Sequence, residues 1–331
     1  MSETHKIKIF TGIRPSGDLT IANYLGAIEP ILKLLKDGAE PMVFVADLHA
    51  LTDNEPSLVK KFVREVVIDY LALGLDPKKT IIFVQSVIGP QLFTLMGYLA
   101  RHISVSELLR VPTLKDKLKG NARGETANAL LLLYPVLMAA DILMQRAEQI
   151  PVGEDQVAHL EVTRLLAKRF NDRYGEVFPI PRPYQVNSLR ILSLKGEGKM
   201  SKSSPEGAIF LTDDINTAVK KVKGSITAIE GMMTDGLESN IKVAKSLCKT
   251  QDDLSRIDAI ISEHMAGKKV MGEFKKILGK VVAEFLTDFQ QQREKISQNP
   301  SIVDAVLDRG ARIAIDNANE TMALVERAMF K

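Results

Sequence analysis

Residues 199–203 read Lys-Met-Ser-Lys-Ser and place two lysines three positions apart, each beside a hydroxyl group. We call these five residues the lysine loop. A cationic stretch interrupted by glycines, residues 195–199, leads into this loop and shares Lys199 with it. An apolar run at 191–194 comes before that stretch. Lysine binds phosphate as a point charge, and serine adds hydrogen bonds. The pattern therefore suits a polyphosphate that is bound briefly and released, although five residues alone fit a solvated Lys/Ser linker equally well.

A second phosphate signal lies near the N-terminus. Strand-like residues 6–10 run into a Gly/Pro/Ser turn at 11–17, and a helical pattern opens near Thr20. Free backbone N–H groups at such a helix start form an anion site. No G-x-G-x-x-G is present, which disfavours a dinucleotide fold of that type. Gly12 and Gly17 have P-loop spacing, but Asp18-Leu19 replaces the required Lys-Ser/Thr, so the lysine loop could supply the missing charge from a distance.

The two signals together resemble the class I aminoacyl-tRNA synthetases. Residues 20–23, Thr-Ile-Ala-Asn, are similar to the family's first nucleotide motif in its Thr-Ile-Gly-Asn form, with Ala22 in place of glycine. The lysine loop matches the second motif letter for letter. Further motifs, at residues 15–24, 47–52, 134–143 and 151–161, narrow the resemblance to tryptophanyl-tRNA synthetases of the bacterial type. It covers about residues 7–205; the C-terminal third matches only in length and helical character.

The resemblance implies an enzyme that attaches L-tryptophan to its cognate tRNA. A tryptophanyl-adenylate would form first from ATP, and AMP and pyrophosphate would be released. Such phosphoryl transfer needs positioning and charge neutralisation more than a nucleophilic side chain. The implied cofactors are ATP and Mg²⁺, with the ion held through the ATP phosphates. The implied partners are tRNA(Trp), L-tryptophan, ATP and a second copy in a cytoplasmic homodimer, with no role for membrane or DNA.

The same resemblance assigns roles at the nucleotide site. Lys199, Lys202 and Asn23 would be catalytic: the lysines would hold the β- and γ-phosphates, and Asn23 would donate a hydrogen bond at the helix start. Lys117 resembles another phosphate lysine, but its loop is longer here, which leaves Lys115 as an alternative. The expected ATP-binding residues are Arg14, Pro15, Ser16, Ala22, Asn23, Lys117, Gly153, Glu154, Asp155, Ile191, Lys199, Met200, Ser201, Lys202 and Ser203.

Asp141 is the expected determinant of amino-acid choice. It lies within an apolar stretch, residues 138–143, and a buried carboxylate needs a partner. The helical pattern alone favours a buried structural ion pair or an aspartate on the helix surface. The resemblance instead pairs Asp141 with the indole N–H of tryptophan, which is a donor-only group. The expected tryptophan-binding residues are Phe10, Tyr134, Met138, Asp141, Ile150, Val152 and Gln156. His49 and His159 have no third ligand at metal-site spacing and are interpreted as core or supporting residues.

Composition is that of an ordinary globular protein. The 331 residues are 45% apolar and 26% charged, and the formal net charge of +3 is too small to indicate a nucleic-acid binder by itself. The single cysteine, Cys248, excludes an internal disulfide and is expected to be inert. No charged-then-apolar leader opens the chain. The longest apolar stretch, residues 127–144, is interrupted by Pro135 and Asp141, so we expect a buried helix.

Strand and helix patterns alternate through the first half. The expected strands cover residues 6–11, 42–46, 80–85, 149–153 and 191–194, and the expected helices cover 23–36, 57–73, 91–100, 126–146 and 156–170. This alternation predicts an α/β, doubly wound parallel sheet of the Rossmann-like kind. Ligands bind such sheets at the carboxyl ends of the strands, where Gly12, Asp47, Gln85 and Gly153 would lie.

Beyond about residue 210 only helices are expected, over residues 213–223, 240–249, 252–265, 268–298 and 301–330. We therefore predict a catalytic domain at 1–205 and a helical, tRNA anticodon-binding domain at 206–331, whose last helix could pack back on the first domain. Residues 205–207 would form the hinge. Lysines gather on this second domain; charge alone favours a solvated face, whereas the resemblance favours an RNA-binding face.

Three other interpretations stay open. A tyrosyl-tRNA synthetase shares the fold and both nucleotide motifs but builds its side-chain pocket differently. A synthetase-like paralogue could bind tryptophan or RNA without charging it; Ala22 supports this idea, and the intact lysine loop opposes it. A dinucleotide oxidoreductase on a similar sheet is disfavoured by the missing glycine motif.

Overall fold

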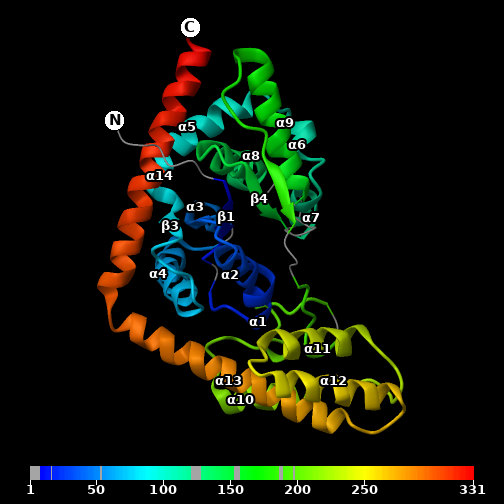
Figure 1. Ribbon diagram of the computed structural model, residues 1–331. Coiled ribbons are helices and arrows are strands. Elements are labelled where there is room, and N and C mark those ends of the chain that lie inside the picture. Colours follow the sequence, from blue (N-terminus) through cyan, green and yellow to red (C-terminus); the bar gives the residue numbers. More distant parts are fainter. Residues whose placement is uncertain are drawn as a thin grey trace.

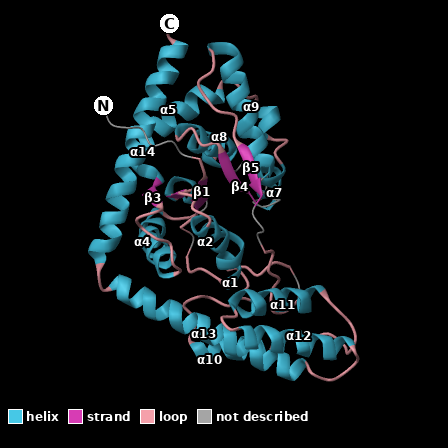
Figure 2. Ribbon diagram, viewed as in Figure 1, coloured by secondary structure: helices cyan, strands magenta, loops and turns pink. Residues whose placement is uncertain are grey.

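A five-stranded parallel arrangement forms the centre of the molecule. The computed structural model describes residues 8–15, 17–52, 54–120, 128–152, 157–185, 189–196 and 198–331. Its strands are β1 (Phe10–Ile13), β2 (Met42–Val45), β3 (Ile81–Val84), β4 (Gln149–Val152) and β5 (Arg182–Gln185). β1 pairs with β2, β2 with β3 and β4 with β5, all in parallel, and a parallel bridge from Ile9 to Gln149 joins the two groups. The order β3-β2-β1-β4-β5 confirms the predicted α/β fold. Figure 2 shows these strands surrounded by helices.

Alternate residues of these strands face two separate hydrophobic clusters. Val43, Val45 and Ile82 belong to one cluster, while Met42 and Phe44 belong to the other. The first cluster also contains residues of α2 and α4, and the second contains residues of α5 and α8. Helices therefore cover both faces of the sheet at β2 and β3, whose residues are nearly all buried (Figure 1).

Helices connect the strands. They are α1 (Ile21–Asn23), α2 (Glu29–Lys36), α3 (Asp47–Ala50), α4 (Pro56–Ala72), α5 (Gly89–Ala100), α6 (Val105–Leu108), α7 (Pro112–Gly120), α8 (Ala129–Met144) and α9 (Val157–Tyr174), with a π-helical turn η1 (Tyr24–Ile28) and a 3₁₀ turn η2 (Gln85–Ile88). The helix predicted over 23–36 is confirmed, since α1, η1 and α2 follow one another without a gap, but its middle is π-helical. Pro30 near the start of α2 has no N–H to donate, and the preceding turn is π-helical.

The predicted strand over 191–194 is also wrong. Leu192 makes an isolated antiparallel bridge with Lys199, and Ser193 N donates to Gly198 O at 3.1 Å. The segment therefore turns back on the lysine loop, a turn that includes Gly196 at a φ of 83°. The helix expected over the apolar stretch is confirmed as α8, whose buried residues include Asp141.

The C-terminal third is helical throughout. After the short η4 (Pro205–Gly207) come α10 (Ile215–Lys223), α11 (Asp235–Leu247), α12 (Gln251–Met265), α13 (Met271–Ser297) and α14 (Pro300–Met329). Helices α10 to α13 pack together, and α14 runs back along β3 and α5 (Figure 1). A Cβ at Gly310 would lie 1.8 Å from the Ile82 carbonyl oxygen, so α14 can approach β3 only through a glycine.

No helix in the described ranges is long and apolar enough to cross a membrane. The boundary between residues 205 and 206 stays a prediction.

Candidate active site

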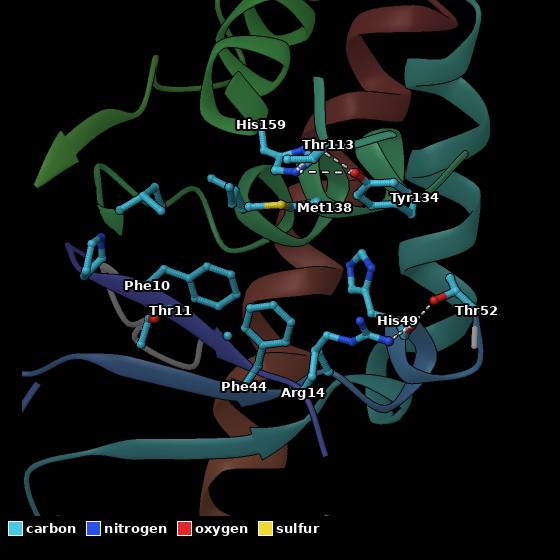
Figure 3. A pocket seen from close by; sticks show the side chains of 15 residues that line it. Phe10, Thr11, Arg14, Phe44, His49, Thr52, Thr113, Tyr134, Met138 and His159 are labelled. Atoms are coloured by element: carbon cyan, nitrogen blue, oxygen red, sulfur yellow. Dashed lines mark hydrogen bonds between the residues drawn. The ribbon is translucent and has the colours of Figure 1, made fainter. Parts of the chain in front are cut away.

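A cavity of about 360 Å³ opens between β1 and β4, where the strand order reverses. This is the position at which doubly wound sheets bind ligands, and the volume lies at the lower end of the range for small-molecule sites. We call it the central cavity. Its apolar lining includes Phe10, Phe44, Met138, Ile142 and Ile150, and its polar lining includes Arg14, His49, Thr113, Tyr134 and His159 (Figure 3).

Two stacked phenyl rings form one wall of the central cavity. The ring centroids of Phe10 and Phe44 are 4.8 Å apart, and the ring planes are 8° from parallel. A Cβ at Gly12 would lie 2.4 Å from the Phe44 ring, so a glycine in β1 is what lets this ring occupy its place. A flat, wide aromatic surface favours a flat apolar ligand.

Asp141 is held by a buried polar network beside this cavity. Gln85 Nε2 donates to both carboxylate oxygens, at 2.8 and 2.9 Å, and His49 Nε2 lies 2.8 Å from Oδ2. Burial raises the pKa of Asp141, and the hydrogen bond from His49 opposes this effect. Since the carboxylate has protein partners, its burial is accounted for without a ligand.

Gln85 connects this network to the ends of two strands. Its Oε1 accepts from the backbone N–H groups of Leu48 at 3.1 Å and His49 at 3.3 Å, directly after β2. Asp47 accepts from the Ser86 N–H at 3.0 Å. Carboxyl ends of β2 and β3 are thus fixed together, and Asp141 of α8 is fixed to both.

The prediction that Asp141 reads the indole N–H therefore remains a prediction. Within the described residues, His49 lines the central cavity and Asp141 lies in contact with His49 without lining it. A carboxylate has about four acceptor positions, and three hydrogen bonds are observed, so a further donor can still be accepted.

The opposite wall carries a hydroxyl and imidazole cluster. Thr113 Oγ1 lies 2.8 Å from the Tyr134 hydroxyl and 2.6 Å from His159 Nε2 (Figure 3). These residues come from α7, α8 and α9, and burial raises the pKa of Tyr134. The cluster gives the cavity a polar side suited to the charged groups of an amino acid.

The lysine loop meets the first nucleotide motif in space. Lys202 Nζ donates to the Gly17 carbonyl at 2.7 Å, across 185 positions of sequence. The neighbouring backbones also pair: Leu211 N donates to Leu19 O at 2.8 Å and Ile21 N donates to Ile209 O at 3.0 Å. The expected meeting of the two phosphate signals is present in the structure.

Thr20 and Asn23 form a capping box at the start of α1. Asn23 Oδ1 accepts from the Thr20 backbone N–H at 2.9 Å, and the Asn23 N–H donates to Thr20 Oγ1 at 3.3 Å. This fixes the Asn23 side chain, because its carbonyl oxygen is used by the cap. Its amide nitrogen is the donor with which it could reach a phosphate.

The other predicted nucleotide-binding residues differ in how far they are exposed. Lys199 and Ser203 are exposed, and Ser201 Oγ lies 2.9 Å from Ser203 Oγ. Ile191 and Met200 are buried in the hydrophobic core. Only their small exposed surface is available for the predicted contact with adenine. Arg14 lines the central cavity and donates from Nη2 to the His49 carbonyl at 3.3 Å.

Several predictions concern parts outside the described residues. They are those for Ser16, Gly153, Glu154, Asp155 and Gln156, and for the side chains of Lys117 and Val152. The alternative phosphate residue, Lys115, has an exposed side chain on α7.

Sequence reasoning did not assign site roles to Phe44 or Thr113. It placed Gln85 at the ligand-binding carboxyl edge of the sheet, directly after β3, but assigned no contact to it. Phe44 and Thr113 had no usable signal, because a strand phenylalanine and a helix-start threonine are common core and cap residues.

Comparison with known proteins places this chain in one family. The model of the class I tRNA synthetases for tryptophan and tyrosine (W and Y) matches residues 1–295. A tryptophan–tRNA ligase of Halalkalibacterium halodurans is 38% identical over 98% of both chains, and that of Bacillus subtilis is 36% identical over 98% of both. The chain belongs to the class I tRNA synthetases of the tryptophan and tyrosine group.

Solved structures agree over the full length. Tryptophanyl-tRNA synthetase from Mycoplasma pneumoniae superposes with a TM-score of 0.86 at 30% identity, covering 99% of this chain and 98% of that one. The Campylobacter jejuni enzyme, solved with ADP and tryptophan, gives a TM-score of 0.82 at 28% identity, covering 98% and 100%.

Proposed function

We propose that this chain is an ATP-dependent ligase that attaches L-tryptophan to its cognate tRNA through a tryptophanyl-adenylate. The observation that carries this function is the position of the central cavity. An aromatic-walled cavity sized for a small ligand lies at the switch point of the sheet, and Arg14 on its lining belongs to the same turn as Gly17, which Lys202 contacts. Family membership and the tryptophan–tRNA ligase names of its relatives support the same reaction.

In the first step, the tryptophan carboxylate attacks the α-phosphorus of ATP and pyrophosphate leaves. Positioning and charge neutralisation supply most of the catalysis in such transfers. Lys199 and Lys202 would hold the β- and γ-phosphates, and Asn23 would donate to them from the start of α1. Mg²⁺ would enter with the ATP phosphates and balance their charge.

We propose that the remaining predicted residues contact the rest of the nucleotide. Arg14, Pro15 and Ser16 would lie at the α-phosphate, and Ala22 at the helix start. The ribose and adenine would contact Gly153, Glu154, Asp155, Ile191 and Met200, with Lys117, Ser201 and Ser203 completing the site.

Tryptophan would lie in the central cavity. Phe10, Met138 and Ile150, which line the cavity, with Val152, would enclose the indole ring, and Asp141 would accept its N–H beside His49. Tyr134 and Gln156 would hold the ammonium and carboxylate groups. Phenylalanine, which has no side-chain donor, would leave the aspartate without this hydrogen bond, and such a loss gives strong discrimination.

The tRNA would use the helical domain, residues 206–331. Several lysines of this domain already have protein partners: Lys221 pairs with Asp213 at 2.7 Å, Lys280 with Asp253 at 2.8 Å, and Lys275 donates to the Ser225 carbonyl at 2.6 Å. Exposed lysines such as Lys269 and Lys276 are therefore better placed than these three to contact RNA.

A homodimer in the cytoplasm completes the proposal. Apolar side chains at Val87, Phe93, Val105 and Leu109 are 36–58% exposed on η2, α5 and α6 or its end. Exposed apolar groups of this kind are typical of subunit interfaces.

The test is amino-acid-dependent exchange of pyrophosphate into ATP, followed by charging of a tRNA(Trp) transcript. We expect exchange with tryptophan, at least about a hundredfold less with tyrosine, and stable charging of the tRNA. Exchange with tyrosine alone would identify a tyrosine enzyme, and binding of tryptophan without exchange would identify an inactive paralogue.

A further inference from the structure

The described lining of the central cavity contains one permanent cation, Arg14, and no carboxylate. Its other polar side chains belong to threonines, a tyrosine and two histidines. An ammonium group can only donate hydrogen bonds, so it must meet acceptors. Among the described lining residues, the side-chain acceptors for an ammonium group are therefore hydroxyl and imidazole groups.

The Tyr134 hydroxyl can serve as such an acceptor only when its own proton points elsewhere. Burial raises the pKa of Tyr134, so the hydroxyl keeps its single proton. Thr113 Oγ1 lies 2.8 Å from this hydroxyl. If Tyr134 donates to Thr113, the tyrosine oxygen is free to accept from a ligand. If Thr113 donates instead, the tyrosine proton points into the cavity and opposes a cation there.

His159 decides between these two directions. Its Nε2 lies 2.6 Å from Thr113 Oγ1. Hydrogen bonds donated by N–H groups to oxygen are about 2.7–3.2 Å long, whereas those donated by hydroxyl groups are about 2.5–3.0 Å long. The short separation indicates that Thr113 donates to Nε2 of a neutral imidazole. Since Thr113 has one proton only, it must then accept the proton of Tyr134.

Packing fixes the three groups relative to one another. His159 is 3% exposed and Tyr134 is 7% exposed, and their rings meet edge to face with centroids 5.3 Å apart. The tyrosine hydroxyl is 3.4 Å from Nε2, which is long for a direct hydrogen bond, so Thr113 is the better bridge between them (Figure 3). Consecutive hydrogen bonds of this kind polarise and strengthen one another.

We propose that Thr113 and His159 are positioning residues for the ammonium group of the amino acid: a hydrogen-bond chain from Tyr134 through Thr113 to His159 directs the tyrosine proton away from the central cavity and leaves the tyrosine oxygen as an acceptor. The inference rests on the proposed function, in which Tyr134 holds the ammonium group of tryptophan. It gives this polar wall of the cavity a preference for one sign of charge.

Ligands that differ in one charged group separate this role from general support of the cavity. Tryptamine has the ammonium group without the carboxylate, and indolepropionate has the carboxylate without the ammonium group. Thr113→Val keeps the side-chain shape and removes the hydroxyl. It should raise the Kd for tryptophan and for tryptamine about tenfold, because a hydrogen bond to a charged group is weakened, and should change the Kd for indolepropionate less than about twofold.

Rescue and kinetics follow from the same reasoning. Thr113→Ser keeps the hydroxyl, so its Kd for each ligand should stay within about threefold of the parent's. In pyrophosphate exchange, Thr113→Val should raise the KM for tryptophan and leave kcat and the KM for ATP nearly unchanged, as expected when binding is lost equally in the ground and transition states.

A cycle through Tyr134 tests whether Thr113 acts through that hydroxyl. In a Tyr134→Phe background, Thr113→Val should weaken tryptophan binding by less than about a further twofold, since no tyrosine proton remains to be directed. The matched control is Thr163→Val, the same substitution one turn beyond His159 on α9. The Thr163 hydroxyl donates to the His159 backbone carbonyl at 3.1 Å and lies outside the cavity lining, so tryptophan binding should equal the parent's.

The imidazole provides a second measurement that needs no variant of Thr113. Nitrogen NMR distinguishes a protonated ring nitrogen from an unprotonated one, and His159→Gln identifies the signals of this ring among the five histidines. We expect Nε2 to be unprotonated at neutral pH with tryptophan bound. A proton on Nε2 would overturn the inference even if Thr113→Val does not fold.

Equal losses for tryptophan and indolepropionate would show that Thr113 only supports the cavity. A loss that persists undiminished in the Tyr134→Phe background, or an equal loss in Thr163→Val, would also overturn the positioning role while leaving the enzyme assignment intact. If the parent binds no tryptophan, the proposed function itself is contradicted.

Discussion

Beside the central cavity, Asp141, Gln85 and His49 hold one another through buried hydrogen bonds that link the ends of β2 and β3 to α8. In the lysine loop, by contrast, Lys199 and Ser203 are exposed, and the described glycines just before it, Gly196 and Gly198, have positive φ angles. One region is assembled before any ligand arrives. The other presents charges that a ligand can attract.

This difference matches two separate tasks. A pocket that must distinguish one side chain from another benefits from groups whose positions are already fixed. A loop that stabilises departing pyrophosphate, the role we propose for the lysine loop, must bind it and then release it. We therefore expect damage to the pocket to change which amino acid is used, and damage to the loop to change how fast it is used.

The largest effect should come from removing the half-buried cation of the lysine loop, Lys202. Lys202→Ala should raise the barrier to adenylate formation by about 2–4 kcal/mol, as for other lost contacts to developing negative charge. Pyrophosphate exchange measures this directly. Lys195→Ala, an exposed lysine just before the loop, is the matched control and should change the rate less than about twofold. Parent-like exchange in Lys202→Ala would end the assignment of a catalytic role to this residue.

A smaller but more selective effect is expected at Asp141. Asp141→Ala should weaken tryptophan selection by more than about tenfold and leave ATP affinity nearly unchanged, because a charge-assisted hydrogen bond is lost. Since the carboxylate also supports His49 and Gln85, Asp141→Asn serves as the variant that keeps the side-chain shape. If calorimetry finds the parent's tryptophan affinity in both variants, Asp141 is purely structural.

Substitution of Ala22 tests whether the proposed phosphate-binding helix start tolerates one added methyl group. Ala22 is not among the described non-glycine residues with positive φ, so its methyl group causes no backbone strain, and it packs partly buried against the core. Ala22→Gly should lower the KM for ATP by about fivefold at most, the equivalent of about 1 kcal/mol for one misplaced methyl group. Steady-state exchange kinetics on both forms give the answer. Exchange that is absent in the parent and strong in Ala22→Gly would mean that the chain is a silenced paralogue.

The smallest effect is expected for the ion pair between Glu107 and Arg169, which lies outside the central cavity. The Arg169 guanidinium bonded to Glu107, with help from Ser104, lowers the pKa of Glu107 to about 2, and this pair ties α6 to α9, which carries His159. A lowered carboxyl pKa stabilises the fold above the ordinary value of 4.5, and the contribution disappears as pH falls toward 2.

Glu107→Gln should therefore lower the unfolding temperature at pH 7 by no more than about two degrees, and the difference from the parent should shrink between pH 4.5 and 2. Glu161→Gln, which removes a surface pair with Arg164 on the same helix, is the control and should show a smaller difference. A difference for Glu107→Gln that is constant with pH would exclude the ion pair as its cause.

Much of the fold could be predicted because its signals are local. Period-2 and period-3.6 patterns identified β1 to β4 and the long helices, and strand alternation with helices identified the parallel sheet. β5 was missed because Pro183 lies inside it, and proline argues against a strand. Helices α3, α6 and α7 were missed because short helices show little periodicity.

The site was predictable only where motifs are continuous in sequence. The lysine loop and the helix start at Thr20 could be recognised. Because the turn before Thr20 lacks the lysine of a P-loop, the sequence also indicated that the lysine loop lies close to it. The partners of Asp141 could not be foreseen, since Gln85 and His49 reach it across 56 and 92 positions.

The most direct test compares Lys202→Ala and Asp141→Ala with the parent in two quantities, tryptophan affinity and the first-turnover rate of adenylate formation at saturating tryptophan. Since the chain contains no tryptophan, fluorescence of the added amino acid reports binding without a protein tryptophan background. We predict that Lys202→Ala keeps the parent's affinity within about twofold and loses about a hundredfold or more in rate, whereas Asp141→Ala loses affinity first. Parallel losses of affinity and rate in both variants would contradict the division between a selecting pocket and an accelerating loop.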